Sequence, residues 1–360
     1  MNKKGNKYIK ALTEKKGVEK ETPRLNPELV FPQKNKKSIS IDTYIKEIKK
    51  GNIVFLSKAI TLIESRHPAH FKKGQEILKK LLPETGNSVR IGVTGVPGVG
   101  KSTFIEKMGA NYTSQGHKVA VLAIDPSSSR TKGSILGDKT RMELLSRDPN
   151  AYIRPTASGN ALGGVARKTR ETIMLCEAAG FDRIIIETVG VGQSETMVHS
   201  MTDFFLLLKL AGAGDELQGI KRGIIEMADL IVINKAEGDN MAAAKLAQKA
   251  FQSALHFYPP KENRWKSEVL LASALHNKGI KEILDKIDAF LELTKNNNHF
   301  EAHRKEQEKF WFKETIHRTI LDRFYSQPGI FSAIEEMNYK IMNNEITAFE
   351  AAEKLLKQFQ

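Results

Sequence analysis

The sequence predicts an α/β protein in which a mainly parallel central sheet is covered by helices. Between residues 89 and 293, short apolar runs rich in β-branched residues alternate with segments of helical periodicity. The runs are nearly continuous in apolar residues, which is typical of parallel strands that are buried on both faces. The expected strands are residues 89–94, 118–125, 183–188, 203–209, 229–234 and 268–273.

Helical segments are expected on both sides of this sheet region. Spaced apolar positions predict helix over residues 41–82, and Pro83 begins the stretch that interrupts it. Beyond residue 298 the pattern is helical again, and Thr347 with Glu350 forms a capping box for the last helix. The expected organisation is a basic tail (residues 1–40), an N-terminal helical region (41–87), a core (88–295) and a C-terminal helical arm (296–360).

Composition indicates a soluble, cytoplasmic protein. The chain has 360 residues, 40% of them hydrophobic, but contains no apolar run of the roughly 18 residues that a membrane span needs. The N-terminus carries lysines without an apolar region behind them, so it does not resemble a secretory signal. The single cysteine, Cys176, excludes an internal disulfide and fits a reducing compartment.

The net charge of +14 does not by itself indicate a nucleic-acid partner. Residues 1–40 hold eleven Lys and Arg against four Glu, a net charge of +7, so half of the excess lies in one polar tail. Aromatic residues are not interleaved with these basic residues. We therefore interpret the tail as a solvated arm and expect neither a nucleic-acid nor a membrane partner.

The stretch "GVTGVPGVGKST" contains a phosphate-binding loop. Gly95, Gly100, Lys101 and Ser102 match the pattern G-x-x-x-x-G-K-[ST], and the match lies between a predicted strand and a predicted helix, as the motif requires. Backbone N–H groups of such a loop surround the β-phosphate, the lysine bridges the β- and γ-phosphates, and the serine hydroxyl ligates Mg²⁺. The expected nucleotide-binding residues are Gly95, Pro97, Gly98, Val99, Gly100, Lys101, Ser102 and Thr103.

A second motif favours GTP over ATP. Asn234 ends the predicted strand 229–234, and Lys235 and Glu237 follow it, where an N-K-x-D motif would lie. The carboxylate of such a motif would accept hydrogen bonds from guanine. Glutamate stands here in place of aspartate, which moves the carboxylate by about one bond length. Ser273 and Ala274, in the loop after the last strand, are expected to contact the edge of the base.

Acidic residues at strand ends predict a magnesium site. Asp125 ends the second expected strand, Glu187 ends the third, and Asp138 lies in the intervening loop. The carboxyl ends of parallel strands meet at the edge where ligands bind, and carboxylate oxygens suit Mg²⁺. For Asp138 a role as helix N-cap is an alternative. Gly190, three residues after Glu187, is expected to offer its N–H to the γ-phosphate.

Six motifs occur in order along the chain: "GVTGVPGVGKST", "AIDPSSSRTKGSILGDKTRM", "NALGGVA", "ETVGVGQSE", "GAGDELQGIKRGI" and "NKAEGDN". Together they resemble the MeaB/ArgK family of methylmalonyl-CoA mutase-associated GTPases. The resemblance implies a P-loop NTPase of the SIMIBI class with a C-terminal dimerisation arm, hence a homodimer. It also implies a G-protein chaperone that uses GTP to gate adenosylcobalamin transfer to methylmalonyl-CoA mutase, or a related cobalamin-dependent mutase, and protects that enzyme.

By position, the resemblance assigns further roles. Lys101 and Ser102 fall on the family's phosphate and Mg²⁺ residues, and the metal-site acids fall on Asp125, Asp138 and Glu187. The segment from Asp215 to Lys221 falls on a mobile switch, with Gln218 and Lys221 as its working side chains. The implied catalytic set is Lys101, Glu187, Gly190, Gln218 and Lys221. Glu237 departs from the family's usual aspartate, which affects the expected affinity for GTP and GDP more than the identity of the base.

Two other functions fit a GTP-binding loop. A metal-delivery GTPase of the hydrogenase or urease type would usually carry a His-rich or Cys-containing metal site, which this sequence lacks. A transport-linked kinase, the older meaning of the ArgK label, would transfer phosphate to a protein partner. The destination of the γ-phosphate, water or protein, distinguishes the kinase from the chaperone.

Overall fold

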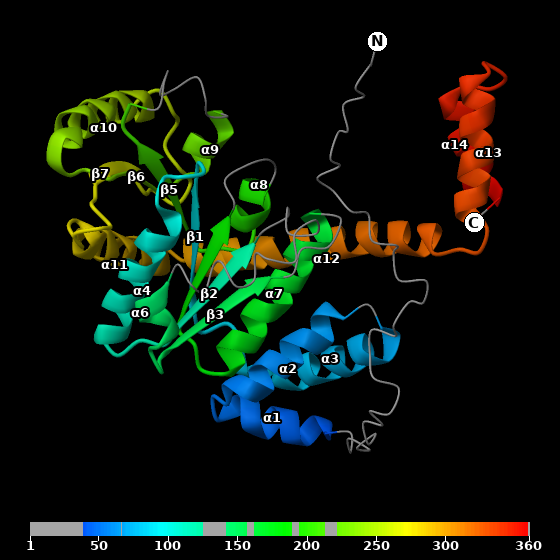
Figure 1. Cartoon of the computed structure of the whole chain (residues 1–360), viewed down its shortest axis with the longest axis horizontal. Helices are drawn as coiled ribbons and strands as arrows, with labels where there is room; N and C mark the ends of the chain where they lie inside the picture. Colours follow the sequence, from blue (N-terminus) through cyan, green and yellow to red (C-terminus); the bar gives the residue numbers. More distant parts are fainter. Residues whose placement is uncertain are drawn as a thin grey trace, which may run out of the picture. The chain divides into compact units, whose positions relative to one another are not determined.

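A computed structural model describes residues 39–65, 67–124, 142–156, 162–188, 194–212 and 222–358. Its centre is a parallel sheet of seven strands in the order β3-β2-β4-β1-β5-β6-β7 (Figure 1). The strands are β1 (Val89–Gly95), β2 (Val119–Ile124), β3 (Ala151–Thr156), β4 (Arg183–Thr188), β5 (Phe204–Leu210), β6 (Leu230–Asn234) and β7 (Glu268–Leu271). The predicted fold class, a mainly parallel α/β sheet with helical extensions, is confirmed.

Helices cover both faces of the sheet, and further helices precede its first strand and follow its last strand in the sequence. Within the described residues they are α1 (Ile41–Lys49), α2 (Ile53–Glu64), α3 (Pro68–Leu81), α4 (Lys101–Ser114), α6 (Glu143–Ser146), α7 (Leu162–Ala178), α8 (Ser194–His199), α9 (Arg222–Met227), α10 (Met241–Leu255), α11 (Ile280–Asn296), α12 (His299–Tyr325), α13 (Ile330–Met342) and α14 (Ala348–Gln358). Short 3₁₀ turns lie at Leu82–Glu84 and Gly238–Asn240. One helical layer is α4, α6 and α11, and the opposite layer includes α9 and α10.

The alternation of strand side chains explains these two layers. In β1, Val89, Ile91 and Val93 pack with apolar residues of α4 and α11 in one core cluster. In β6, Ile231 and Ile233 belong to a second cluster with α10 on the other face. Because successive side chains of a strand point to opposite faces, a strand buried on both faces needs apolar residues throughout. The uninterrupted apolar runs of the sequence reflect this arrangement.

The sequence predicts six strands, whereas the sheet has seven. The six expected strands are present, but a seventh, β3, has the sequence "AYIRPT" and is not among them. Arg154 and Pro155 break its apolar pattern, and a proline within a run argues against an inner strand. β3 lies at the edge of the sheet beside β2, where a missing backbone N–H is tolerated.

The N-terminal helical region consists of three helices that pack against α7. Asn52 separates α1 from α2 and caps α2, since its side chain accepts hydrogen bonds from the N–H groups of Val54 and Phe55. Polar contacts join this region to the core: Gln75 donates to Glu171 of α7 at 2.8 Å. Glu64, at the end of α2, pairs with Arg154 of β3 at 2.5 Å.

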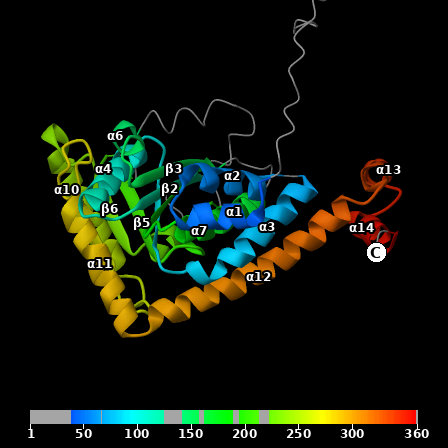
Figure 2. The same ribbon diagram turned by 90° about the horizontal axis from the view of Figure 1, so that it is seen from below.

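The long helix α12 runs from α11 to α13 (Figure 2), and its buried residues, Phe300, Gln307 and Trp311, all lie in its first half. Its first half contacts the core, where Trp311 is 2% exposed and donates from Nε1 to the carbonyl of Ser200 at 3.0 Å. Its second half exposes apolar side chains, beginning with Phe312 at 67%. Among the helices of the described ranges, none is long and apolar enough to cross a membrane.

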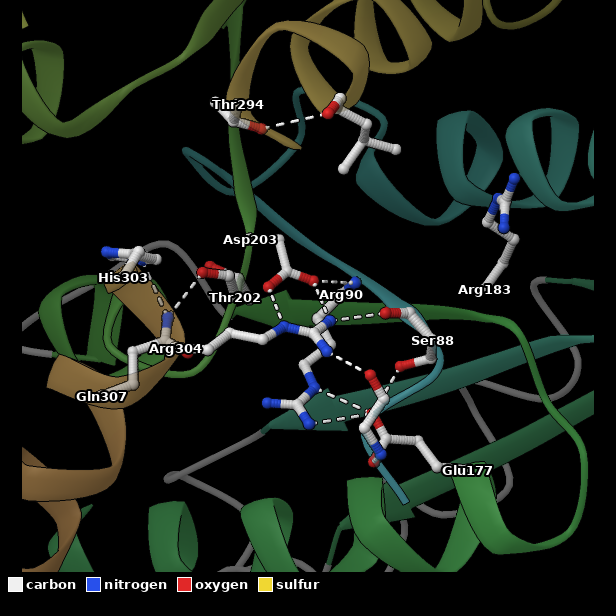
Figure 3. A network of polar contacts seen from close by, with 12 residues as sticks. Ser88, Arg90, Glu177, Arg183, Thr202, Asp203, Thr294, His303, Arg304 and Gln307 are labelled. Carbon is white, nitrogen blue, oxygen red and sulfur yellow. Dashed lines mark hydrogen bonds and ion pairs between the residues drawn. The ribbon is translucent and has the colours of Figure 1, made fainter. Parts of the chain in front are cut away.

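A buried polar network fixes α12 to the starts of β1 and β5 (Figure 3). Arg304 of α12 donates to both oxygens of Asp203, at 2.8 and 2.7 Å, and to the carbonyls of Gly86 and Ser88. Asp203 also accepts from the backbone N–H of Arg90 at 2.8 Å. The Arg90 side chain in turn pairs with Glu177 of α7. A continuous series of ion pairs and hydrogen bonds therefore joins α12, the sheet and α7.

Candidate nucleotide-binding site

The predicted phosphate loop lies at the carboxyl edge of the sheet, between two neighbouring strands. It follows β1, which pairs with β4 on one side and with β5 on the other. Val93 of β1 is in register with Glu187 of β4, and Gly95 is in register with Leu208 of β5. A loop that leaves the sheet at this edge and leads into a helix N-terminus is the usual place for a phosphate.

Two glycines of the loop are required by close contacts. A Cβ atom on Gly95 would lie 2.6 Å from the carbonyl oxygen of Leu208, closer than side-chain atoms can approach. Gly100 precedes α4 with φ +91°, and a Cβ there would lie 2.9 Å from Nδ2 of Asn234. Since left-handed φ and tight packing both favour glycine, the spacing of the motif has a structural reason at both positions.

Lys101, the first residue of α4, lies over the loop. Its Nζ donates to the carbonyl oxygens of Gly95 at 2.7 Å and Val96 at 3.3 Å. Burial lowers the pKa of the Lys101 ammonium, while the negative charges of Glu187 and Glu195 oppose this effect. The side chain is thereby held beside the loop whose N–H groups are predicted to bind the phosphates. Pro97, Gly98 and Val99 are in that loop, and Thr103 is in the first turn of α4.

The structure brings together two of the predicted magnesium ligands. Ser102 Oγ lies 3.4 Å from Oε1 of Glu187, which stands near the end of β4. A hydroxyl and a carboxylate oxygen are hard donors, so this pair fits Mg²⁺. Over the described stretches of chain, no three His, Cys, Asp or Glu side chains gather as a metal-binding set. The remaining predicted acids, Asp125 and Asp138, are outside those stretches.

Asn234 connects the phosphate loop to the predicted base-binding loop. It ends β6, is 1% exposed, and donates from Nδ2 to the carbonyl of Val99 at 2.8 Å. Its Oδ1 accepts from the N–H of Ala274 at 3.2 Å. Both loops depend on this one amide, because each supplies a backbone group that Asn234 satisfies. Lys235 follows with φ +59°, and Asn240 donates to its carbonyl at 2.7 Å.

Glu237 and Ser273 form the other side of the predicted base site. The Ser273 hydroxyl donates to Oε2 of Glu237 and accepts from the N–H of His276 at 3.2 Å. This contact orients a carboxylate that the sequence predicts as the guanine acceptor. The structure thus gathers Asn234, Glu237, Ser273 and Ala274, from two loops that are far apart in the sequence, beside the phosphate loop.

Several predicted site residues lie outside the described part of the chain. They are Asp125, Asp138, Gly190, Gln218 and Lys221. Their neighbours in sequence show where they connect: Asp125 comes directly after β2, and Gly190 follows β4 by two residues. Gln218 and Lys221 are between β5 and α9.

Glu195 of α8 is not among the residues predicted from the sequence, yet it belongs to this neighbourhood. Its side chain is buried, with the residue 3% exposed, and its charge acts on the Lys101 ammonium. It occurs in "ETVGVGQSE", eight residues after Glu187. A single acidic residue in a helical segment is common, so the sequence alone does not single it out.

Comparison with known proteins assigns the family. The family model described as methylmalonyl Co-A mutase-associated GTPase MeaB matches residues 56–329. The chain belongs to the MeaB family. It is 46% identical over 318 residues to a probable GTPase of Mycobacterium tuberculosis, covering 88% of this chain and 95% of the relative. It is 44% identical over 303 residues to the GTPase ArgK of Escherichia coli, covering 84% of this chain and 92% of the relative.

Two further relatives are similar over most of their length. The mouse methylmalonic aciduria type A homolog, a mitochondrial protein, is 44% identical over 330 residues, covering 89% of this chain and 80% of the relative. A crystal structure of a protein named LAO/AO transport system kinase is 36% identical, has a TM-score of 0.71, and is matched over 88% of this chain and 96% of that chain. The predicted family is confirmed. This MeaB-family protein is a GTPase and binds guanine nucleotides, and its family is linked to methylmalonyl-CoA mutase.

Proposed function

We propose that this protein is a G-protein chaperone of methylmalonyl-CoA mutase, or of a related cobalamin-dependent mutase. It would use GTP to gate the loading of adenosylcobalamin and to protect the mutase. The proposal is supported by the MeaB-family match together with a nucleotide site whose two halves are joined through Asn234. Through Asn234, the loop that is predicted to bind the phosphates is linked to the loop that is predicted to bind the base.

In the proposed hydrolysis, water attacks the γ-phosphorus and the bond to the β–γ bridging oxygen breaks, which leaves GDP and phosphate. The ammonium of Lys101 neutralises charge on the β- and γ-phosphates. Ser102 and Glu187 would hold Mg²⁺, which would offset negative charge on the phosphates. Asp125 and Asp138 are the other acids that we propose for this metal site. The N–H of Gly190 is proposed to sense the γ-phosphate.

Gln218 and Lys221 are the proposed link to the mutase. They lie between the end of β5, which is paired with β1 beside the phosphate loop, and the start of α9. A nucleotide can shift an equilibrium only through contacts that differ between two states, and an ammonium and an amide are groups that can form such contacts. GDP and GTP would then differ in how these side chains meet the mutase.

The test is steady-state GTP hydrolysis with and without purified methylmalonyl-CoA mutase. We expect the mutase to accelerate hydrolysis by the wild-type protein. Gln218→Ala and Lys221→Ala should keep basal GTP binding but lose the acceleration, whereas Lys245→Ala, on the exposed face of α10, should keep both. Full acceleration in the first two variants would remove these residues from the proposed link, and no acceleration of the wild type would contradict the chaperone proposal itself.

The C-terminal helices are the proposed dimer interface. The second half of α12 together with α13 and α14 exposes large apolar side chains, among them Phe312 (67%), Phe331 (68%), Met342 (81%) and Phe349 (81%). Apolar patches of this kind mark protein interfaces. Sedimentation should give the mass of two chains for the wild type and of one chain for Phe331→Glu/Phe349→Glu. A dimeric double variant would place the interface elsewhere.

A transport-linked kinase is the second candidate, favoured by the name of the similar protein whose crystal structure is known. In that reaction the γ-phosphate of GTP would move to a side chain of a protein partner instead of to water. Incubation with GTP labelled at the γ-phosphate distinguishes the two reactions. Label released as inorganic phosphate supports the chaperone, and label retained on a protein supports the kinase.

A further inference from the structure

Asn111 is a polar residue in the second half of α4, the helix that follows the phosphate loop. Asparagine is a weak helix former, because its side chain competes with the backbone for hydrogen bonds. Here one N–H of its side-chain amide donates to the carbonyl of Lys107, one turn earlier in the same helix, at 2.8 Å. This bond fixes the orientation of the amide, and its second N–H is available to another element of the fold.

The second N–H reaches the loop that is predicted to bind the base. Nδ2 of Asn111 donates to Oδ1 of Asn277 at 3.0 Å, across 166 residues of sequence. Asn277 has φ +52°, a left-handed conformation that asparagine adopts more readily than most residues with a side chain. Its backbone N–H donates to the carbonyl of Ala274 at 3.4 Å. The contact therefore holds the same turn that carries a predicted base-contacting residue.

The tip of this turn gains little from packing. Leu275 is 66% exposed, and His276, Asn277 and Lys278 are also exposed. A segment with few buried apolar contacts opens at a low cost in free energy. The position of the turn therefore depends on polar contacts more than on the apolar core.

Among the described residues, two side-chain amides from other elements anchor this turn near its two ends. Asn234, which ends β6, accepts from the N–H of Ala274 at 3.2 Å. Asn111 of α4 donates to Asn277. Because α4 begins with Lys101, the second anchor ties the turn to the helix that starts at the predicted phosphate site.

We propose that Asn111 is a positioning residue for guanine-nucleotide binding, whose amide holds the turn of residues 274–277 in place relative to the phosphate loop. The inference rests on the predicted base site and not on the proposed mutase partner. When only a fraction of a protein has its site in the competent arrangement, the apparent affinity falls by that fraction. Loss of the contact should weaken binding of GTP and GDP alike, because both carry the guanine base.

The first test measures the affinity for fluorescently labelled GTP and GDP. Asn111→Ala removes the donor and is favourable in a helix, and Asn277→Gly removes the acceptor but permits the left-handed backbone. Each should weaken binding of both nucleotides by about threefold or more, as expected for the loss of one hydrogen bond. Thr113→Ala removes a hydrogen bond within α4, to the carbonyl of Ala110, and as matched control should change affinity less than about twofold. Unchanged affinity in both test variants overturns the proposal.

A double variant shows whether the two residues act through one contact. If they do, Asn111→Ala/Asn277→Gly should bind GTP no more weakly than the weaker-binding single variant. Losses that multiply would mean that the residues act independently, which overturns the proposal. Asn277→Asp keeps an acceptor oxygen and should bind GTP within about twofold of the wild type. A loss as large as that of Asn277→Gly would contradict the contact.

Steady-state hydrolysis separates positioning of the turn from a merely structural role. Asn111→Ala should raise the KM for GTP and retain kcat, because the contact acts on base binding and leaves the phosphate site intact. A fall in kcat at saturating GTP, or weaker binding of GTP alone, would place the effect at the γ-phosphate and overturn the proposal. A lower melting temperature with unchanged KM would overturn it by showing that the contact only stabilises the fold.

Glu237→Ala tests the base site on which the inference rests. Weaker GTP binding in Glu237→Ala with unchanged binding in Asn111→Ala would overturn the role of Asn111 alone. Unchanged GTP binding in both variants would overturn the base site as well. These measurements contain no mutase, so a failure of the proposed mutase partner is a separate result.

Discussion

The buried pair of Arg304 and Asp203 should be the most sensitive point of attachment of α12. The Asp203 side chain is 1% exposed and that of Arg304 is 12% exposed, so both are desolvated. Replacing Arg304 with Met keeps the aliphatic packing against Phe300 but removes the guanidinium that donates to both Asp203 oxygens. Asp203 would keep the N–H of Arg90 as a donor. Leaving a buried charge without its counter-charge costs about 3–5 kcal/mol.

Urea denaturation followed by circular dichroism measures this loss as a fall in the free energy of unfolding. Arg318→Met is the matched control on the same helix, because Arg318 and Asp322 are 33% and 62% exposed and 3.7 Å apart, and exposed pairs contribute about 0–1 kcal/mol. Adding Asp203→Asn to Arg304→Met should restore part of the stability, since the uncompensated charge is then removed. A loss below about 1 kcal/mol for Arg304→Met would refute the argument that this pair anchors the helix.

Three further predictions concern the nucleotide site and pH. Lys101→Ala should lower GTP turnover by at least about 10²-fold with an unchanged melting temperature, and near-normal turnover would contradict its phosphate role. Glu237→Ala should weaken GTP binding by about tenfold or more without weakening ATP binding; unchanged preference for GTP in a competition assay would mean that another residue reads the base. Burial lowers the pKa of His199 from 6.5 to about 4, so its neutral form is favoured in the folded state. Stability should therefore be full above pH 6.5 and fall toward pH 4, by about 2 kcal/mol at pH 5, and equal losses in wild type and His199→Phe would exclude this histidine as the cause.

The parts of the fold that the sequence predicts are those whose side chains are buried on both faces. β1, β4, β5 and β6 have no polar interruption within the sheet core except near their ends, and their apolar runs are visible without a structure. β3 has one inner neighbour, so it tolerates Arg154, which pairs with Glu64, and Pro155. Tertiary contacts that are absent from the local sequence therefore decide its strand conformation.

In the candidate site, the residues of the phosphate-loop motif are predictable from the sequence, whereas contacts between distant segments are not. Gly95, Gly100 and Lys101 are recognisable because a phosphate loop needs them at fixed spacing. The contact between Glu237 and Ser273 was not predicted, because it joins two loops separated by 36 residues. Glu195 was not predicted because one acidic residue in a helix is common, and only burial beside Lys101 distinguishes it.

The nucleotide edge and the Arg304 network lie at opposite ends of the same two strands. β1 begins beside Arg90 and ends at the phosphate loop, and β5 begins after Asp203 and ends before Gly212. Because each strand is hydrogen-bonded to neighbours on both sides, neither can shift alone. Changes that depend on GTP should therefore be confined to loops at the carboxyl edge, while the amino edge keeps α12 in place. Such a division gives the second half of α12 a fixed support, and it agrees with our proposal that Gly190, Gln218 and Lys221 report nucleotide state to a partner.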